Sequence, residues 1–321
     1  MLKYLLKRLV IGLITILIAF TLTFFLTRVA PGNPIRVLAG KENPNPEQIA
    51  YLTEYYGLDQ PLHIQFVTYV QGLLRGDFGR SIVNNRPVTD MIRERIIPTL
   101  ALSFTAMLLS TFLGTLLGLV AGKQAGSRLD RILCNISYII DAIPSFWLSM
   151  MFIIFFAVRL GWLPTGGMYS FRETYTGLAR LVDLVRHMIL PVSVLVIIQM
   201  PYYFRVSRAS VRSILNEDFI KTLRAGGVME NRIYRKYVLR NAIIPVITAF
   251  SLSLSFVLAG AAMVEIVFAW PGMGRVIIDA VTKRDYAVLS GIYLMLSISV
   301  TFFMIVSDVV YAVVDPRIHL T

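Results

Sequence analysis

The most regular feature of the sequence is a series of long apolar runs that carry little or no charge. A helix that crosses a bilayer needs about 20 mostly apolar residues. Polar segments separate six such runs, at 9–27, 96–122, 132–158, 188–204, 241–264 and 286–307. Only the third holds an acid well inside it, Asp141, and the last continues past Asp308 to Val314. The pattern predicts an all-α, polytopic membrane protein with six transmembrane helices.

The first apolar run needs a separate decision, because Lys3, Lys7 and Arg8 precede it as in a secretory signal peptide. The apolar part of a signal peptide is roughly 7–15 residues long and ends at an A-x-A-like cleavage site. The run at 9–27 is longer, and no such site follows it. We therefore interpret it as a retained transmembrane helix.

Composition excludes an ordinary soluble enzyme. Hydrophobic residues make up 56% of the chain, charged residues 16%, and mean hydropathy is +0.68; soluble domains have about 25% charged residues. The single cysteine, Cys134, excludes an internal disulfide framework. His63, His187 and His319 lie far apart, so no local Cys/His metal motif exists and we expect no metal site.

Six crossings place both termini on one side of the membrane, and the distribution of Lys and Arg indicates which side. If the termini are cytoplasmic, the inside segments carry 16 Lys and Arg, against 7 in the two shorter outside segments. The outside loop 28–95 is left out, since long loops cross largely regardless of charge. We expect both termini in the cytoplasm, with these inside segments: 1–8, 123–131, 205–240 and 315–321.

The external loops contain structure of their own. In 47–56 and 64–74 the apolar residues fall at helical spacing. The simpler interpretation is a helical cap on the outer membrane face; the alternative is a docking surface for an external partner. At the last external loop, Glu265 and Trp270-Pro271-Gly272 indicate a plain helix break rather than a short re-entrant gate.

The cytoplasmic segment 205–240 is the most informative stretch, and nine of its 36 residues are basic. Helical spacing at Phe219, Ile220 and Leu223 is interrupted by Gly226-Gly227, and a second helical run follows. One interpretation is a basic amphipathic hairpin held by anionic lipid. The other is a knob that protrudes toward a cytoplasmic partner.

Motifs along nearly the whole chain resemble one family. The stretch from Glu217 to Gly227, followed by 239–245 (LRNAIIP), resembles the EAA loop of ABC importer permeases, above all the B-type permeases of dipeptide, oligopeptide and nickel importers. Further motifs agree in the expected order: 57–62 (GLDQPL), 75–81 (RGDFGRS), 144–147 (PSFW), 163–167 (LPTGG) and 268–275 (FAWPGMGR). Two departures, Lys221-Thr222-Leu223 in place of Glu-Ala-Ala and a more distant Pro245, look typical of the peptide subgroup.

The resemblance implies a type I ABC importer permease fold and a role for the short helix before Gly227. In such a family this helix sits in a groove of an ATPase subunit. Apolar side chains would fill the groove, basic ones would pair with acids at its rim, and Gly227 would permit a turn with positive φ. The implied coupling residues are Glu217, Asp218, Phe219, Ile220, Lys221, Leu223, Arg224, Gly226 and Gly227.

The chain itself carries no nucleotide-binding motif. A P-loop reads G-x-x-x-x-G-K-[ST], whereas the Gly-Lys pairs here, Gly40-Lys41 and Gly122-Lys123, lack both the hydroxyl residue and the upstream glycine. No catalytic set is evident. We expect no cofactor on this chain, and we expect partner ATPase subunits to use ATP and Mg²⁺.

Within the membrane, Asp141 and Pro144 are candidates for the translocation pathway. An ionised carboxylate at the bilayer centre costs roughly 3 kcal/mol on insertion scales, so Asp141 should face a cavity or a partner. Pro144 should distort the helix and free a carbonyl group. A packing acid that stabilises the kink is an equally good interpretation. The stripe Gly114, Gly118 and Gly122 indicates close helix packing.

Together these features predict three parts: 1–95, a helix with the external loop; 96–314, the core permease domain with coupling loop 205–240; and 315–321, a cytoplasmic tail. The expected function is import of di- or oligopeptides across the bacterial cytoplasmic membrane, with nickel or a metal chelate as alternative cargo. Expected partners are a second permease in a heterodimer, two ATPase subunits and an extracytoplasmic binding protein. A self-sufficient secondary transporter or channel would show inverted repeats or several intramembrane charges.

Overall fold

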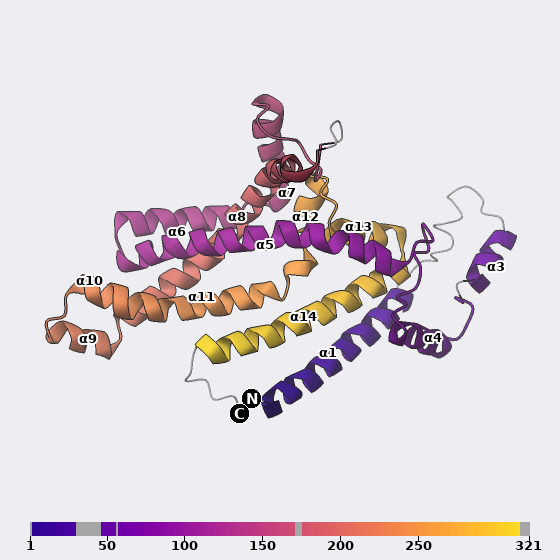
Figure 1. Ribbon diagram of the computed structural model, residues 1–321, viewed down its shortest axis with the longest axis horizontal. Helices are drawn as coiled ribbons and strands as arrows, with labels where there is room; N and C mark the ends of the chain where they lie inside the picture. The colour runs from indigo at the N-terminus through magenta and orange to yellow at the C-terminus, as the bar shows by residue number, and fades with distance from the viewer. Residues whose placement is uncertain (1, 30–45, 56, 171–174, 315–321) are drawn as a thin grey trace.

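The chain folds into long helices that run roughly alongside one another (Figure 1). The computed structural model describes residues 2–29, 46–55, 57–170 and 175–314. In these ranges it contains helices and turns with one isolated bridge, Arg80 to Pro87, so the all-α prediction is confirmed. The elements are α1 (Leu2–Val29), α3 (Pro46–Tyr55), α4 (Leu62–Leu74), α5 (Val88–Lys123), α6 (Arg128–Asp141), α7 (Ser145–Phe152), the π-helix η1 (Ile153–Arg159), α8 (Gly177–Leu215), α9 (Asp218–Ala225), α10 (Glu230–Arg232), the π-helix η2 (Ile233–Val238), α11 (Leu239–Leu254), the 3₁₀ turn η3 (Val257–Ala259), α12 (Ala262–Val267), α13 (Met273–Lys283) and α14 (Tyr286–Val314).

Five of the predicted spans are helices long and apolar enough to cross a membrane, within the described residues. The third predicted span, 132–158, is not one straight helix: α6 and the α7–η1 helix meet at a bend of 98°. Pro144 caps α7 at this bend with extended backbone, because proline cannot donate the helical hydrogen bond and pushes its predecessor out of helical geometry. The distortion expected at Pro144 is confirmed.

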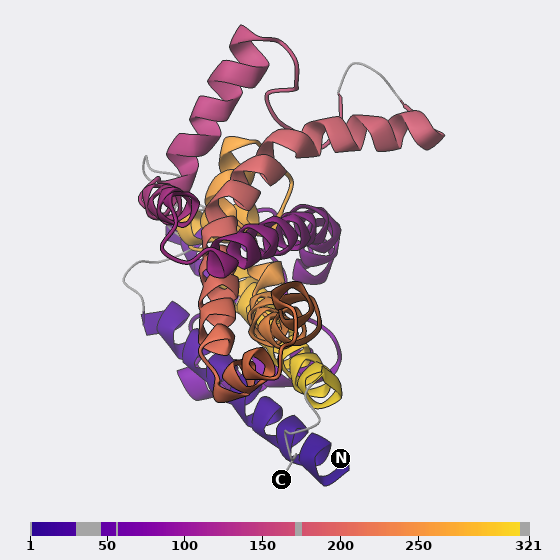
Figure 2. The same cartoon turned by 90° about the vertical axis from the view of Figure 1, so that its left-hand side faces the viewer.

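Helix α8 is much longer than the charge-free block 188–204 that predicts it. It runs for 39 residues and contains Pro191 and Pro201. Its last turns extend through Leu215, so the cytoplasmic segment expected at 205–240 begins inside this helix. Figure 2 shows the first part of α8 bent away from the bundle, in a different direction from the arm formed by α7 and η1.

Close packing of α5 on α8 forms the centre of the bundle. A Cβ atom at Gly114 would lie 2.6 Å from the carbonyl oxygen of Met200, and one at Gly118 would lie 2.5 Å from that of Phe204. Gly122 faces Val211 in the same way. Since no side chain fits between these backbones, the glycine stripe is a helix-packing surface, as expected.

Helix α1 packs along α14 and also contacts α4 of the predicted external loop. Near one end of this pair, Arg8 forms an ion pair with Asp308 at 3.0 Å. Near the other, Phe20 and Phe24 of α1 stack on Tyr69 of α4 and pack against Phe66 in tilted and edge-to-face contacts. Helix α4 is therefore a cap packed on the end of the bundle. The other predicted helix of this loop is α3, although Tyr56 lies outside the described residues.

Candidate functional site

A short helical knob, formed by α9 and α10, protrudes from one end of the bundle (Figure 1). Glu217, in extended conformation, caps the start of α9, and Gly226 caps its end after Ala225. Gly227 follows with φ of 75°, the left-handed conformation that glycine adopts without steric cost. The helix–glycine–helix pattern and the positive φ expected at Gly227 are both observed.

The knob is seated on an apolar cluster of its own chain. Ile220 is fully buried against Val211 of α8 and Ile233 and Val238 of η2, and Leu223 packs partly against the same cluster. Tyr234 donates a hydrogen bond of 2.7 Å to the carbonyl oxygen of Leu119. These contacts tie α9 to α5, to α8 and to η2, the segment that leads into α11.

This packing corrects the orientation expected for the apolar side chains of α9. Ile220 and Leu223 do not point out to fill a partner's groove, because at i and i+3 they share the face that covers the cluster. Phe219 lies on the other face and is 42% exposed. Any role of Ile220 in coupling is therefore to position α9, while Phe219 remains available for contact.

The charged residues of α9 also have partners within the chain. Lys221 pairs with Asp218 at 2.7 Å, and Arg224 forms a two-pronged contact with Glu230 whose shorter bond is 2.6 Å. The bond to Glu230 raises the pKa of the Arg224 guanidinium. These pairs are exposed, so they hold the knob weakly and leave its charges open to exchange with another protein.

Asp141, the candidate pathway acid, has a partner on another helix. Its carboxylate accepts a hydrogen bond of 2.5 Å from Arg205 of α8, and the same guanidinium donates to Ser137 at 2.9 Å. Nearby, Arg208 binds both carboxylate oxygens of Asp130. The expectation that Asp141 faces a partner is met by Arg205, while pathway roles for Asp141 and Pro144 stay predictions.

Sequence reasoning missed the buried network around Glu265. Its carboxylate accepts hydrogen bonds from Thr99 of α5 at 2.9 Å and from the backbone N–H of Gly274 at 2.7 Å. The indole of Trp270 donates to the carbonyl oxygen of Pro98 at 2.9 Å. The signal was present: a lone acid before two glycines, Gly272 and Gly274, each too close to the carboxylate to carry a side chain.

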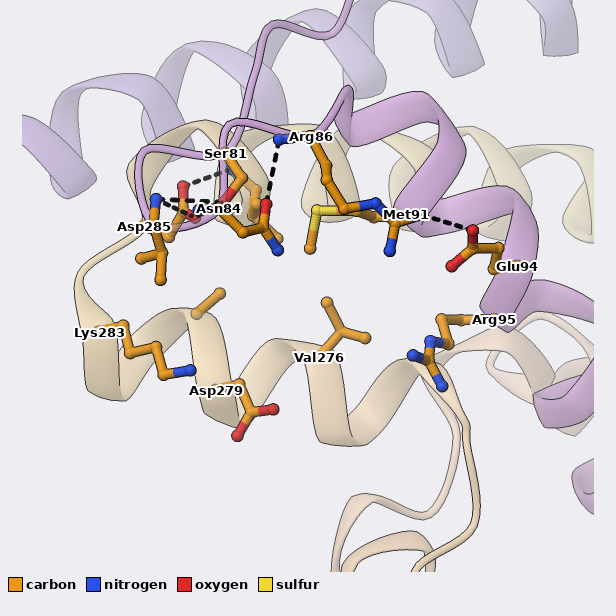
Figure 3. Close-up of a pocket in the computed structure, with 13 residues that line it drawn as sticks. Ser81, Asn84, Arg86, Met91, Glu94, Arg95, Val276, Asp279, Lys283 and Asp285 are labelled. Atoms are coloured by element: carbon orange, nitrogen blue, oxygen red, sulfur yellow. Dashed lines mark hydrogen bonds and ion pairs between the residues drawn. The ribbon is translucent and has the colours of Figure 1, made fainter. Parts of the chain in front are cut away.

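At the end of the bundle opposite the knob, a cavity of about 170 Å³ lies between the start of α5 and α13 (Figure 3). Asp285 closes one side by accepting hydrogen bonds from Ser81 and the backbone of Ile82. The lining also includes charged groups of both signs: Arg86, paired with Glu94, together with Arg95, Asp279 and Lys283. The described residues contain no group of three or more His, Cys, Asp or Glu side chains placed to hold a metal.

Comparison with known proteins covers nearly the whole chain. Residues 114–320 match the model of the binding-protein-dependent transport system inner membrane component, and residues 1–103 match the N-terminal model of the same systems. The glutathione transport system permease protein GsiC of Escherichia coli (strain K12) is 39% identical over 320 residues, covering 99% of both chains. The oligopeptide transport system permease protein AppB of Bacillus subtilis (strain 168) is 34% identical, covering 99% of this chain and 100% of AppB.

A solved structure shows the same fold. A chain of the MetNI methionine ABC transporter, in an inward-facing form, superposes with a TM-score of 0.54 over 71% of this chain and 97% of that one, at 19% identity. Together with the family match, this makes the protein a membrane transport component rather than an enzyme. The chain belongs to the binding-protein-dependent ABC importer permeases, of the peptide and glutathione type.

Proposed function

We propose that this chain is one of two related permease subunits in an ATP-driven importer of short peptides, located in the bacterial cytoplasmic membrane. The observation that carries the proposal is similarity over 99% of the chain to a permease of glutathione transport and one of oligopeptide transport. Glutathione and oligopeptides share peptide chemistry and small size. An extracytoplasmic binding protein would deliver the cargo, as the family description implies.

In this proposal the knob formed by α9 and α10 is the contact for a cytoplasmic ATPase subunit. Phe219 is exposed on its outer face, and the exposed charges around it are held only by local pairs. Ile220 anchors the knob from inside. Two such ATPases would bind ATP and Mg²⁺, and their closure would reach the membrane helices through the apolar seat of α9.

The opposite end of the bundle would face the binding protein. The start of α1, the end of α14 and α9 lie toward one end in Figure 1, and α4, the start of α5 and α13 lie toward the other. With α9 in the cytoplasm, the cavity between α5 and α13 opens outside. Its charged rim offers both signs of charge to a docking protein.

The cargo can be tested in cells that lack this chain and are complemented with it. Radiolabelled di- and tripeptides and radiolabelled nickel are supplied separately, each at limiting concentration, and initial uptake is measured. The proposal predicts that peptide uptake depends on the chain and nickel uptake does not. Nickel uptake that follows the chain, with peptide uptake unchanged, would replace peptides by a metal cargo.

A further inference from the structure

One transmembrane segment is interrupted well inside the apolar run 241–264. Helix α11 ends at Leu254, a 3₁₀ turn covers Val257–Ala259, and Gly260 follows with φ of 70° before α12 begins. Non-helical backbone at membrane depth is tolerated only where protein buries it or where it lines a water-filled cavity. The space beside the break should therefore be filled by other helices or open to water.

A cavity of about 350 Å³ lies at this break, between α5, α8 and the 3₁₀ turn. The volume is within the ~300–1,000 Å³ typical of small-molecule sites. Its lining includes Ser103 of α5, Gln199 and Tyr202 of α8, and Ser253 and Phe256 beside the break. Ser103 and Gln199 thus place polar groups near the middle of the apolar helices α5 and α8.

Ser103 is the unexplained group in this lining. Its side chain is 8% exposed, and its hydroxyl has no hydrogen-bond partner within the described part of the chain. Buried hydroxyls are nearly always paired, so one that lines a cavity without a protein partner is available to a group inside that cavity. Gln199 accepts one bond, from Ser110 at 3.3 Å, through its amide oxygen.

The lining selects a chemical class of ligand. Within the described residues the cavity has no Asp, Glu, Lys, Arg or His, so it offers no counter-ion to the charged termini of a short peptide and suits the uncharged amide groups between them. A hydroxyl and a carboxamide each supply a donor and an acceptor, which match the C=O and N–H of a peptide bond. The aromatic rings of Tyr202 and Phe256 offer apolar surface beside them.

We propose that this cavity contacts the cargo in transit, and that the hydroxyl of Ser103 and the carboxamide of Gln199 bind an amide group of the passing peptide. The proposal rests on peptides being the cargo, as argued above. It assigns the contact to the break between α11 and α12, and not to the ion pair of Asp141 with Arg205.

The test uses the complete transporter in proteoliposomes, with ATP and a saturating concentration of peptide-loaded binding protein. The variants are Ser103→Ala and Gln199→Ala. Ser299→Ala is the matched control, because Ser299 of α14 is also a buried hydroxyl without a partner in the described residues but does not line this cavity. We expect peptide uptake to fall roughly 2- to 10-fold in the first two, the effect of one hydrogen bond, and to stay unchanged in the control.

A paired cargo separates amide recognition from general damage. An ester analogue of the same peptide lacks one N–H donor, and wild-type transporter should carry it more slowly than the peptide. In Ser103→Ala or Gln199→Ala the ratio of the two rates should move toward one. If wild-type transporter carries peptides but both variants match Ser299→Ala, this inference is wrong and the proposed function stands. If wild-type transporter carries no peptide, the proposed function itself is wrong.

Thiol labelling gives a readout that does not depend on transport. In a Cys134→Ser background, cysteines at positions 103 and 253 should react with a hydrophilic maleimide, and one at position 299 should not. Loaded binding protein and ATP should slow labelling at 103. Absence of labelling at 103, as at 299, would show that water does not reach the cavity and would overturn the assignment.

Discussion

The carboxylate of Glu265 accepts a hydrogen bond from the backbone N–H of Gly274 at 2.7 Å, at the first turn of α13. A negative group at a helix N-terminus satisfies free N–H donors and faces the positive end of the helix dipole. Thr99 of α5 donates to the same carboxylate and accepts from the N–H of Met273. The buried carboxylate of Glu265 thus joins α13 to α5, next to Pro98 inside α5.

This junction predicts a large stability effect at a residue far from α9. Glu265→Ala leaves buried donors without an acceptor, so the free energy of unfolding should fall by about 2 kcal/mol. Glu94→Ala is the control, since it removes an exposed pair with Arg86 worth under about 1 kcal/mol. Thermal unfolding of the purified complex in detergent compares them; similar melting temperatures for both variants would show that the network contributes little.

The two faces of α9 should respond differently to the same substitution. Phe219→Asp changes an exposed side chain, so the protein should insert and melt normally while its ATPase subunits co-purify less well. Ile220→Asp buries a carboxylate without a partner and should lower the amount of folded protein. Membrane abundance and ATPase recovery are measured for both. Normal ATPase recovery with Phe219→Asp would remove this face from the contact.

Adjacent glycines at the end of α9 provide a matched pair. Gly227→Val forces a branched side chain into positive φ, which costs about 1–2 kcal/mol, whereas Gly226 has φ of −77° and room for a methyl group. We expect Gly227→Val to reduce uptake at normal membrane abundance and Gly226→Ala to leave it unchanged. Equal uptake by both variants would mean that the turn geometry does not matter for coupling.

The ion pair between Asp141 and Arg205 separates a structural role from a pathway role. Asp141→Asn leaves the guanidinium of Arg205 without its carboxylate, and an unpaired charge within a transmembrane segment is costly. We therefore expect the single variant to reduce transporter stability and uptake, and Asp141→Asn with Arg205→Gln to restore much of both. Restored melting temperature with uptake still absent would instead assign the pair, Asp141 with Arg205, to the pathway.

Sequence patterning predicts the membrane helices well, because crossing a bilayer imposes an apolar length that composition reveals. It underestimates α8, since the helix continues past Arg205, where polar residues end the apolar signal but not the backbone hydrogen bonds. It also misses the break after Leu254. Gly260 is the main local signal there, and apolar content does not distinguish a helix from a turn that other helices shield.

The knob formed by α9 and α10 shows a second limit of sequence reasoning. The spacing of Phe219, Ile220 and Leu223 predicts a short helix, and Gly227 its turn, because both follow from local backbone preferences. Which side chain faces a partner depends on the tertiary neighbours Val211 and Ile233, which come from other helices. The same holds for Glu265, whose partners lie in α5 and α13.

The central claim is that this chain is the permease of an importer powered by ATP. The most direct test measures peptide accumulation and ATP hydrolysis together in proteoliposomes that contain the complete complex. The account predicts accumulation against a gradient only when ATP and loaded binding protein are on opposite faces, with ATP on the side of α9. Peptide movement that persists without ATP, or that follows an ion gradient, would contradict it.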